Sequence, residues 1–413
     1  MTSLASTTVT RNFRCFSWNV VKRGPSILCV LLSLFFVCPQ ASARTADPDL
    51  QKSLEQRAAF SADQVTALQR GEIVVKLIPV NDQREVAVCG VMNLPSDPET
   101  ALKSFQLSLS QLKQKSRLQS GKFSNSPRVE DLGSLTLTDR DIEDLKKCTV
   151  GDCKLKLSAA MIRRFQNSID WNATDYSDQV NQLFRLMIVE YVTAYLQRGD
   201  AALIEYADQS TRVNLAREQE SLLANLLYVN DAAPEFVRHL KTSPRSSVPV
   251  EHSLTWARIN FGLKPVFVIN DVSTYRSEVD GVPRLLVLSK QIYADHYLDS
   301  SLSLTAVIGD HTGTSSRLLY VNHSRASALA SMFSKLKHQV VEGRATDNLE
   351  DLLRQTRLNI DVVLNNSPES FEPTQERTSE WYAMRIIPGS GLLILIVILL
   401  YGTFNRKMLR LRK

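Results

Sequence analysis

The segment from Tyr293 to Tyr297 reads Tyr-Ala-Asp-His-Tyr and holds the residues best suited to chemistry. A carboxylate beside a histidine can orient the imidazole for general base catalysis, and tyrosines can line a pocket. His296 is therefore the candidate catalytic base. The segment ends a predicted strand, however, and adjacent residues on a strand point to opposite faces. Asp295 can serve His296 only where the strand is bulged; the alternative interpretation is a strand end with aromatic packing.

Other catalytic patterns are missing from the sequence. It contains no G-x-S-x-G nucleophile elbow, no glycine-rich phosphate loop and no H-E-x-x-H motif. The remaining histidines are scattered without the spacing of metal ligands: His239, His252, His311, His323 and His338. We therefore expect no metal site and no cofactor.

Cys148 and Cys153 enclose a four-residue loop, Thr-Val-Gly-Asp, whose Gly-Asp pair favours a turn that brings the two thiols together. In an oxidising compartment this spacing predicts a small disulfide. Metal binding is the alternative, but the segment supplies only two ligands and no histidine lies nearby. Cys89 lies in an apolar run and is expected to be a buried small hydrophobic residue.

Hydrophobic periodicity and capping residues predict the elements that position these groups. The expected helices cover residues 61–70, 95–112, 138–147, 159–167, 176–197, 213–227 and 232–241, and the expected strands cover 73–79, 85–94 and 154–157. Ser61, Thr138 and Ser158 are the expected helix caps. The two strands at 73–79 and 85–94 are expected to form a hairpin.

The chain becomes strand-rich from Leu254 to Asn322. Asp280-Gly281 is typical of a hairpin turn. Residues 301–308 alternate, with Leu302, Leu304, Ala306 and Ile308 on one face and Ser301, Ser303, Thr305 and Val307 on the other. Asp310 to Gly313 then turns the chain back. This pattern predicts an antiparallel meander.

A long amphipathic helix is expected to close the domain. Its apolar stripe over about residues 325–342 consists of Leu329, Met332, Phe333, Leu336 and Val340. A second amphipathic stretch follows Gly343, with Leu349, Leu352, Leu353 and Ile360. The predicted fold is thus α+β: an antiparallel meander packed on a C-terminal helix within residues 44–366, with a helical insertion at about 158–241.

Both ends of the chain carry targeting or membrane-anchoring signals. Residues 1–43 combine basic residues, the apolar run Ile27 to Cys38 and the sequence Ala41-Ser42-Ala43, which is typical of a cleaved signal peptide; a retained signal anchor is the alternative. Residues 386–404 contain no charge and are long enough to span a bilayer. The basic tail 405–413 predicts a cytoplasmic C-terminus. Residues 367–385 are expected to form a juxtamembrane stalk, so the bulk of the chain is expected outside the cytoplasm, in the periplasm of a Gram-negative cell.

The net charge of +6 comes from these ends. The signal region and the tail hold nine of the 49 basic residues, which leaves 40 basic against 43 acidic residues, a net charge of about −3, in between. The electrostatic pattern of a nucleic-acid-binding protein is therefore absent, and we expect no nucleic-acid partner.

Two resemblances follow from these features. The order of strands and helices, meander and long final helix over about residues 73–342 resembles START-like (helix-grip) domains. That resemblance implies an apolar cavity between the sheet and the last helix. Through the VGDC segment and SKQIYADHY the chain is also similar to uncharacterised bacterial exported membrane-anchored proteins, which implies no activity.

Three functions remain open from the sequence. The favoured hypothesis is a binding module that takes a lipid or other hydrophobic small molecule near the bilayer, in a cavity between sheet and closing helix. Its candidate lining residues are aromatic: Trp256, Phe267, Tyr275, Tyr293 and Tyr297. The second hypothesis is an enzyme on the same scaffold that uses His296, and the third is a structural or assembly protein of the cell envelope.

Overall fold

The computed structural model describes residues 48–114, 117–133, 135–242, 249–260, 264–331 and 334–365. The predicted signal peptide, stalk, membrane span and basic tail (1–43, 367–385, 386–404 and 405–413) lie outside these ranges. Among the helices within the ranges, none combines the length and apolar character that crossing a membrane requires.

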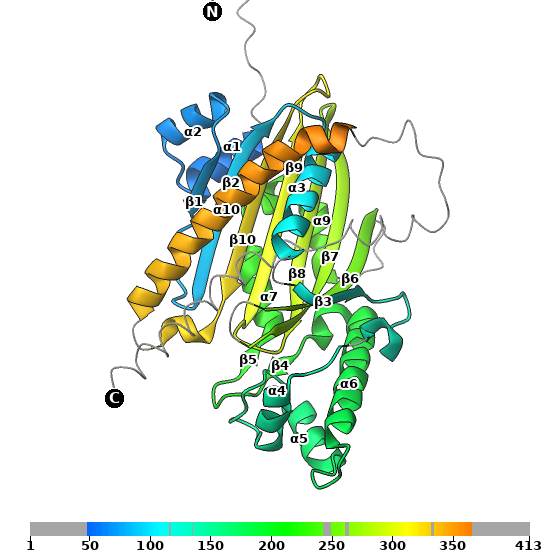
Figure 1. Ribbon diagram of the computed structural model, residues 1–413. Coiled ribbons are helices and arrows are strands. Elements are labelled where there is room, and N and C mark those ends of the chain that lie inside the picture. The colour runs from blue at the N-terminus through cyan, green and yellow to red at the C-terminus, as the bar shows by residue number, and fades with distance from the viewer. Residues whose placement is uncertain are drawn as a thin grey trace, which may run out of the picture. The chain divides into compact units, whose positions relative to one another are not determined.

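An antiparallel sheet of eight strands forms the centre of the protein (Figure 1). Its strands are β1 (Val74–Leu77), β2 (Glu85–Leu94), β3 (Arg117–Lys122), β6 (Val250–Ile259), β7 (Val266–Val279), β8 (Val282–Ala294), β9 (Ser300–Gly309) and β10 (Ser316–Arg325), in the order β1-β2-β10-β9-β8-β7-β6-β3. The predicted hairpin (β1–β2) and meander (β6–β10) are both confirmed. A separate short pair joins β4 (Glu205–Tyr206) to β5 (Val213–Asn214).

Most predicted helices are present with their caps. The α-helices are α1 (Pro48–Lys52), α2 (Ala62–Gln69), α3 (Pro98–Gln114), α4 (Asp139–Lys146), α5 (Ala159–Ser168), α6 (Tyr176–Arg198), α7 (Leu215–Asn225), α8 (Val229–Ala232), α9 (Pro234–Thr242) and α10 (Ser334–Asn365). Short helical turns occupy η1 (Ser53–Arg57), η2 (Val129–Leu132), η3 (Gly199–Ala202) and η4 (Ser327–Ala330). Ser61, Thr138 and Ser158 each accept a hydrogen bond from the third residue of their helix, as expected of N-caps.

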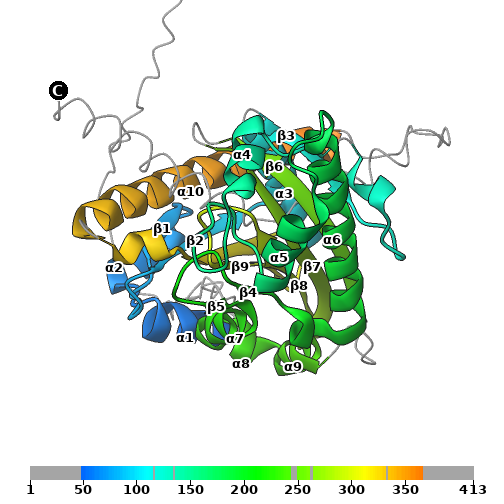
Figure 2. The ribbon, with the colours of Figure 1, turned by 90° about the horizontal axis from the view of Figure 1, so that it is seen from below.

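Helices cover both faces of the sheet. On one face α3 and α10 bury a cluster that includes Met92, Phe105 and Tyr320. On the other face α1, α7, α8 and α9 bury a cluster that includes Leu304 and Phe236 (Figure 2). Leu304 and Tyr320 lie on opposite faces because side chains alternate along each strand. The α+β architecture with a large antiparallel sheet and a C-terminal helix agrees with the sequence analysis.

The closing helix differs from the expected one. One continuous helix, α10, runs through Gly343, and Leu336 of the predicted stripe is 47% exposed. Met332 and Phe333 lie outside the described residues. The second predicted stretch does the packing: Leu349, Leu352 and Leu353 are fully buried against α3 and β2. Burial of these leucines outweighs the cost of about 1 kcal/mol for a glycine inside a helix.

The helices α4, α5 and α6 gather beyond one end of the long strands (Figure 1). Their core joins Phe184 and Val192 of α6 to Phe267 and Tyr293 of the sheet. The predicted strand at 154–157 is not formed, although Leu155 and Leu157 are buried in this core. Their alternation therefore reflects packing of an irregular segment, and this segment leads into α5.

Candidate functional site

The structure places His296 in a buried ion cluster. The strand β8 ends at Ala294, so Asp295 and His296 lie in the following turn. Asp295 accepts a hydrogen bond from the Phe267 backbone N–H at 2.8 Å. The carboxylate that contacts His296 is Asp141, which caps α4 and lies 3.2 Å from the histidine Nε2. The partner of the histidine is thus a residue far away in the sequence.

Both ring nitrogens of His296 face acceptors, because Nδ1 lies 3.1 Å from the Lys154 carbonyl oxygen and Nε2 faces Asp141. Each nitrogen must therefore carry a proton. Burial opposes the charge, but the Asp295 charge and the Asp141 hydrogen bond outweigh it and raise the pKa of His296. Burial also raises the pKa of Asp295 to about 6. A doubly protonated, 3% exposed imidazole has no free lone pair for base catalysis and instead tethers α4 to the sheet.

His296→Gln is expected to destabilise the protein in a pH-dependent way. The folded pKa lies above the unfolded value of about 6.5, so the stabilisation is complete below that pH and disappears as the pH rises through the folded pKa. We expect the variant to lose about 1.5–3 kcal/mol at pH 5.5 and progressively less above neutrality. Denaturant unfolding from pH 5.5 to 9 measures this, with exposed His311→Gln as control. A loss that grows with pH would contradict the assignment.

The five candidate aromatic residues lie in packed regions. Trp256, Phe267 and Tyr293 are at most 4% exposed and form a chain of ring contacts, with centroids 5.9 Å apart at each step. Tyr275 belongs to a different core cluster and stacks on Phe236, with the ring centroids 5.1 Å apart. Tyr297 is only partly buried and packs beside His296. The structure therefore brings three of the five together, as core residues at the end of the sheet.

Cys148 and Cys153 form the predicted disulfide, and Cys89 is a free, buried cysteine. The loop is held by backbone hydrogen bonds from Gly151 and Cys153 to the carbonyls of Ala207 and Asp208. The disulfide-closed loop is thus held, just before α5, against the segment that contains β4.

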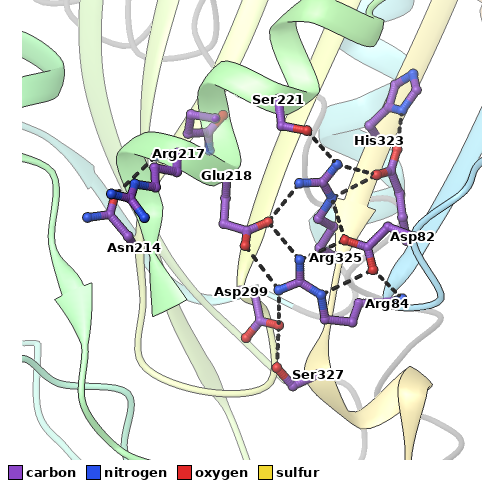
Figure 3. A network of polar contacts seen from close by, with 12 residues as sticks. Asp82, Arg84, Asn214, Arg217, Glu218, Ser221, Asp299, His323, Arg325 and Ser327 are labelled. Atoms are coloured by element: carbon purple, nitrogen blue, oxygen red, sulfur yellow. Dashed lines mark hydrogen bonds and ion pairs between the residues drawn. The ribbon is translucent and has the colours of Figure 1, made fainter. Parts of the chain in front are cut away.

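A second charged group is larger than the His296 cluster and only partly buried. Figure 3 shows Arg84 and Arg325 set among the carboxylates of Asp82, Glu218 and Asp299. Arg325 also pairs with Glu85 at 2.7 Å, and Glu85 accepts a hydrogen bond from His323. Burial opposes ionisation of Glu85, but its bond from His323 and the charge of Arg325 lower its pKa.

This network extends to Lys156, whose ammonium lies 2.9 Å from Asp299. Its members come from the turn before β2 and its first residue, the end of β10, α7, the loop after β8 and the segment before α5. Each charged side chain of the network faces a partner of opposite sign. The network therefore holds α7 against the end of the β2–β10 pair, where Glu85 lies opposite Arg325.

A pocket of about 510 Å³ lies among the helices at the end of the sheet. One wall is the first turn of α5, Ser158 to Met161, with Arg164 one turn further on. The opposite wall is one face of α6, where Met187, Glu190, Tyr191, Ala194 and Arg198 recur at helical spacing. Ala202, Ile204, Glu205 and Arg212 close it from the β4–β5 segment. A pocket of this size suits a small-molecule ligand.

Small side chains create the space. Four alanines line the pocket, two from α5, one from α6 and one from η3. Tyr191 forms part of the wall, and its hydroxyl donates a hydrogen bond to the Ile292 carbonyl at 2.5 Å. Its ring lies 6.2 Å from that of Tyr293. The wall is therefore held rigidly by the aromatic core at the end of the sheet.

Positive charge dominates the polar part of the pocket. Arg164 pairs with Glu190 at 2.5 Å, which neutralises both. Arg198, Arg212 and the remaining acid, Glu205, also line the pocket, and neither arginine has a hydrogen bond or ion pair with any described residue. The first turn of α5 adds backbone N–H groups that the helix itself does not bond. The pocket thus combines an apolar wall with two arginines that have no partner among the described residues.

Sequence reasoning did not identify this pocket. The apolar face of α6 was visible as a period of three to four residues, but that pattern does not distinguish core from pocket wall. The signal that could have pointed to it is the run of small residues at the start of α5 together with arginines at Arg198 and Arg212.

Within the described ranges, no cluster of three or more histidine, cysteine or acidic side chains is arranged to hold a metal ion. The chain matches no protein-family model, and no curated protein and no solved structure shows significant similarity to it.

Proposed function

We propose that this chain is a binding protein whose pocket between α5, α6 and the β4–β5 segment takes an amphipathic anion. The observation that carries the proposal is the pairing of an alanine-lined pocket of about 510 Å³ with two arginines that lack partners in the described chain. A carboxylate or phosphate head would lie at Arg198 and Arg212. An alkyl or aromatic body would lie against Met161, Met187 and Tyr191.

We also propose that the domain lies outside the cytoplasm, as expected from the sequence. A cleaved signal peptide and the apolar segment 386–404 would hold the domain outside the cytoplasm and beside a bilayer. The Cys148–Cys153 disulfide supports an oxidising compartment. A membrane is a source of amphipathic anions, because lipids and fatty acids have this composition.

The finer fold assignment is also a proposal. We propose that the meander and α10 belong to a START-like arrangement, supported by the final helix packing on the sheet beside α3. The ligand pocket proposed above lies elsewhere, in the helical segment inserted before β6. His296 has no part in it, because its nitrogens are occupied by Lys154 and Asp141.

Arg198→Gln and Arg212→Gln are each expected to weaken binding of dodecanoate by about five- to tenfold, since each removes one charge-assisted hydrogen bond. Dodecanol, which lacks the charge, is expected to bind weakly to the wild type. Neither substitution is expected to change its affinity. Titration calorimetry of the full chain in amphipol measures both ligands below their aggregation concentrations.

Arg163→Gln is the matched control, because Arg163 is exposed on α5 beside Arg164 and is not part of the pocket wall. Ala194→Leu should fill the pocket and abolish binding, whereas Ala201→Leu, on an exposed neighbouring turn, should not. Equal effects of the pocket and control substitutions would refute the proposal.

A further inference from the structure

Two histidines from different elements are in direct contact. His239 lies in the last turn of α9, and His252 lies near the start of β6. Their Nε2 atoms are 2.7 Å apart, and the stacked rings have their centroids 5.0 Å apart. His239 is 3% exposed, whereas the His252 side chain is 25% exposed. We call these two residues the histidine pair.

The short distance between the two nitrogens restricts their protonation. A neutral imidazole has one N–H donor and one lone pair. At 2.7 Å the Nε2 atoms form a hydrogen bond only when one of them carries a proton and the other does not. If both carry a proton, two donors face each other and two positive charges lie side by side. The contact therefore requires one unprotonated Nε2.

The other ring nitrogen of His252 faces acceptors on β7. Its Nδ1 lies 3.1 Å from the Ser273 hydroxyl oxygen and 3.5 Å from a carboxylate oxygen of Asp271. The Tyr195 hydroxyl of α6 donates a hydrogen bond to the second oxygen of Asp271 at 2.6 Å. Burial opposes ionisation of Asp271, but its contact with His252 and the charge of Lys290 lower its pKa. The pair can therefore take up one proton at Nδ1 of His252 and keep its contact.

A further proton would have to bind to His239, and the surroundings of this residue oppose it. Burial lowers the pKa of His239, the charge of His252 lowers it further, and the charge of Asp271 offsets only part of this effect. Because the folded pKa lies below the unfolded value of about 6.5, the stabilisation by His239 is complete above that pH and is lost as the pH falls below it.

The other charged groups near α9 have partners or face solvent. Glu235, one turn before His239, accepts a hydrogen bond from the Tyr275 hydroxyl at 2.7 Å. Lys290 of β8 pairs with Asp200 of η3 at 2.5 Å. The exposed cations of α9 are Arg238 and Lys241. Since histidine is the side chain that ordinarily titrates between pH 5 and 8, the pair is the group here that responds in this range.

We propose that the histidine pair is an acid-released clasp: it holds the last turn of α9 against β6 at neutral pH and frees that turn when the pH falls. The first half of the helix keeps its own contact, because Phe236 stacks on Tyr275. Release is therefore confined to the residues from His239 to the helix end at Thr242. The clasp is independent of the proposed anion pocket, since neither histidine lines it.

Hydrogen exchange of the full chain in lipid nanodiscs at pH 7.5 and pH 5.0, corrected for the pH dependence of intrinsic amide exchange, tests the clasp. Protection of the last turn of α9 is expected to fall at least about fivefold at the lower pH, since loss of one ordinary hydrogen bond changes a local opening equilibrium by that order. Glutamine does not titrate, so His239→Gln and His252→Gln are each expected to reduce this pH difference to less than about twofold.

His311→Gln is the matched control, because it removes an exposed histidine from the turn between β9 and β10 and should keep the full pH response. Protection of α6 reports whether each variant is folded, and if one glutamine variant does not fold, the other decides. Equal protection of the last turn of α9 at both pH values in the wild type would overturn the proposal. A pH response that persists in the folded glutamine variants would also overturn it.

Discussion

Asp299→Asn is expected to lower the free energy of unfolding by about 3–5 kcal/mol, because it leaves a buried ammonium without its nearest counter-charge. The Asp299 side chain is fully buried, 2.9 Å from Lys156 and hydrogen bonded to Ser327 at 2.6 Å. Asparagine keeps the shape but not the charge. The second acid near Lys156 is Asp208 at 3.8 Å, and burial raises the pKa of that carboxyl.

The control is Asp347→Asn, which removes an exposed charge from α10 and is expected to change stability by no more than about 0.5 kcal/mol. Denaturant unfolding of both variants at pH 7 gives the comparison. The double variant Lys156→Met with Asp299→Asn should recover much of the loss, because it removes both charges. If Asp299→Asn costs no more than the control, the network does not fasten α7 and the strand ends as described.

Leu353→Ala is expected to cost about 2–5 kcal/mol, since it opens a cavity where α10 meets the sheet. Leu353 is fully buried, and its Cδ1 lies so close to β2 that a Cβ on Gly90 would be 2.7 Å away. The glycine thus allows the helix to approach the strand, and the leucine fills the contact.

Leu358→Ala is the matched control, one and a half turns further along the same helix, where the leucine is 68% exposed. Its cost should stay within about 0.5 kcal/mol. Thermal and denaturant unfolding of the two variants would measure the difference. Similar losses would mean that α10 is not packed through the face that contains Leu349 and Leu353.

Local features of the sequence predicted much of the secondary structure. Ser61 and Thr138 each stand three residues before a residue that completes a capping box, and both boxes form. Alternation over 301–308 placed Leu304 and Ser303 on opposite faces of β9, as the register requires. The six-residue span from Cys148 to Cys153 was enough to predict the disulfide. These signals work because they depend on contacts between residues near in sequence.

Alternation did not show that both faces of β9 are covered. Ser303 and Leu304 are both buried, on opposite faces, because helices far apart in the chain pack on the sheet. For the same reason the first predicted stripe is only partly confirmed: Leu329 is buried, in η4, whereas Leu336 is exposed. Periodicity identified two amphipathic stretches in α10, but only contact with α3 and β2 decided that Leu349 is buried and Leu336 exposed.

The sequence by itself determined the helices, the meander, the caps and the cysteine pair, since each is specified by spacing along the chain. Tertiary structure decided which groups meet. His296 finds Asp141, 155 residues away, instead of its neighbour Asp295. Arg198 of α6 and Arg212 near β5 line one pocket together with the first turn of α5. Spacing can tell which face of an element is apolar, but it does not encode which distant surface packs against it.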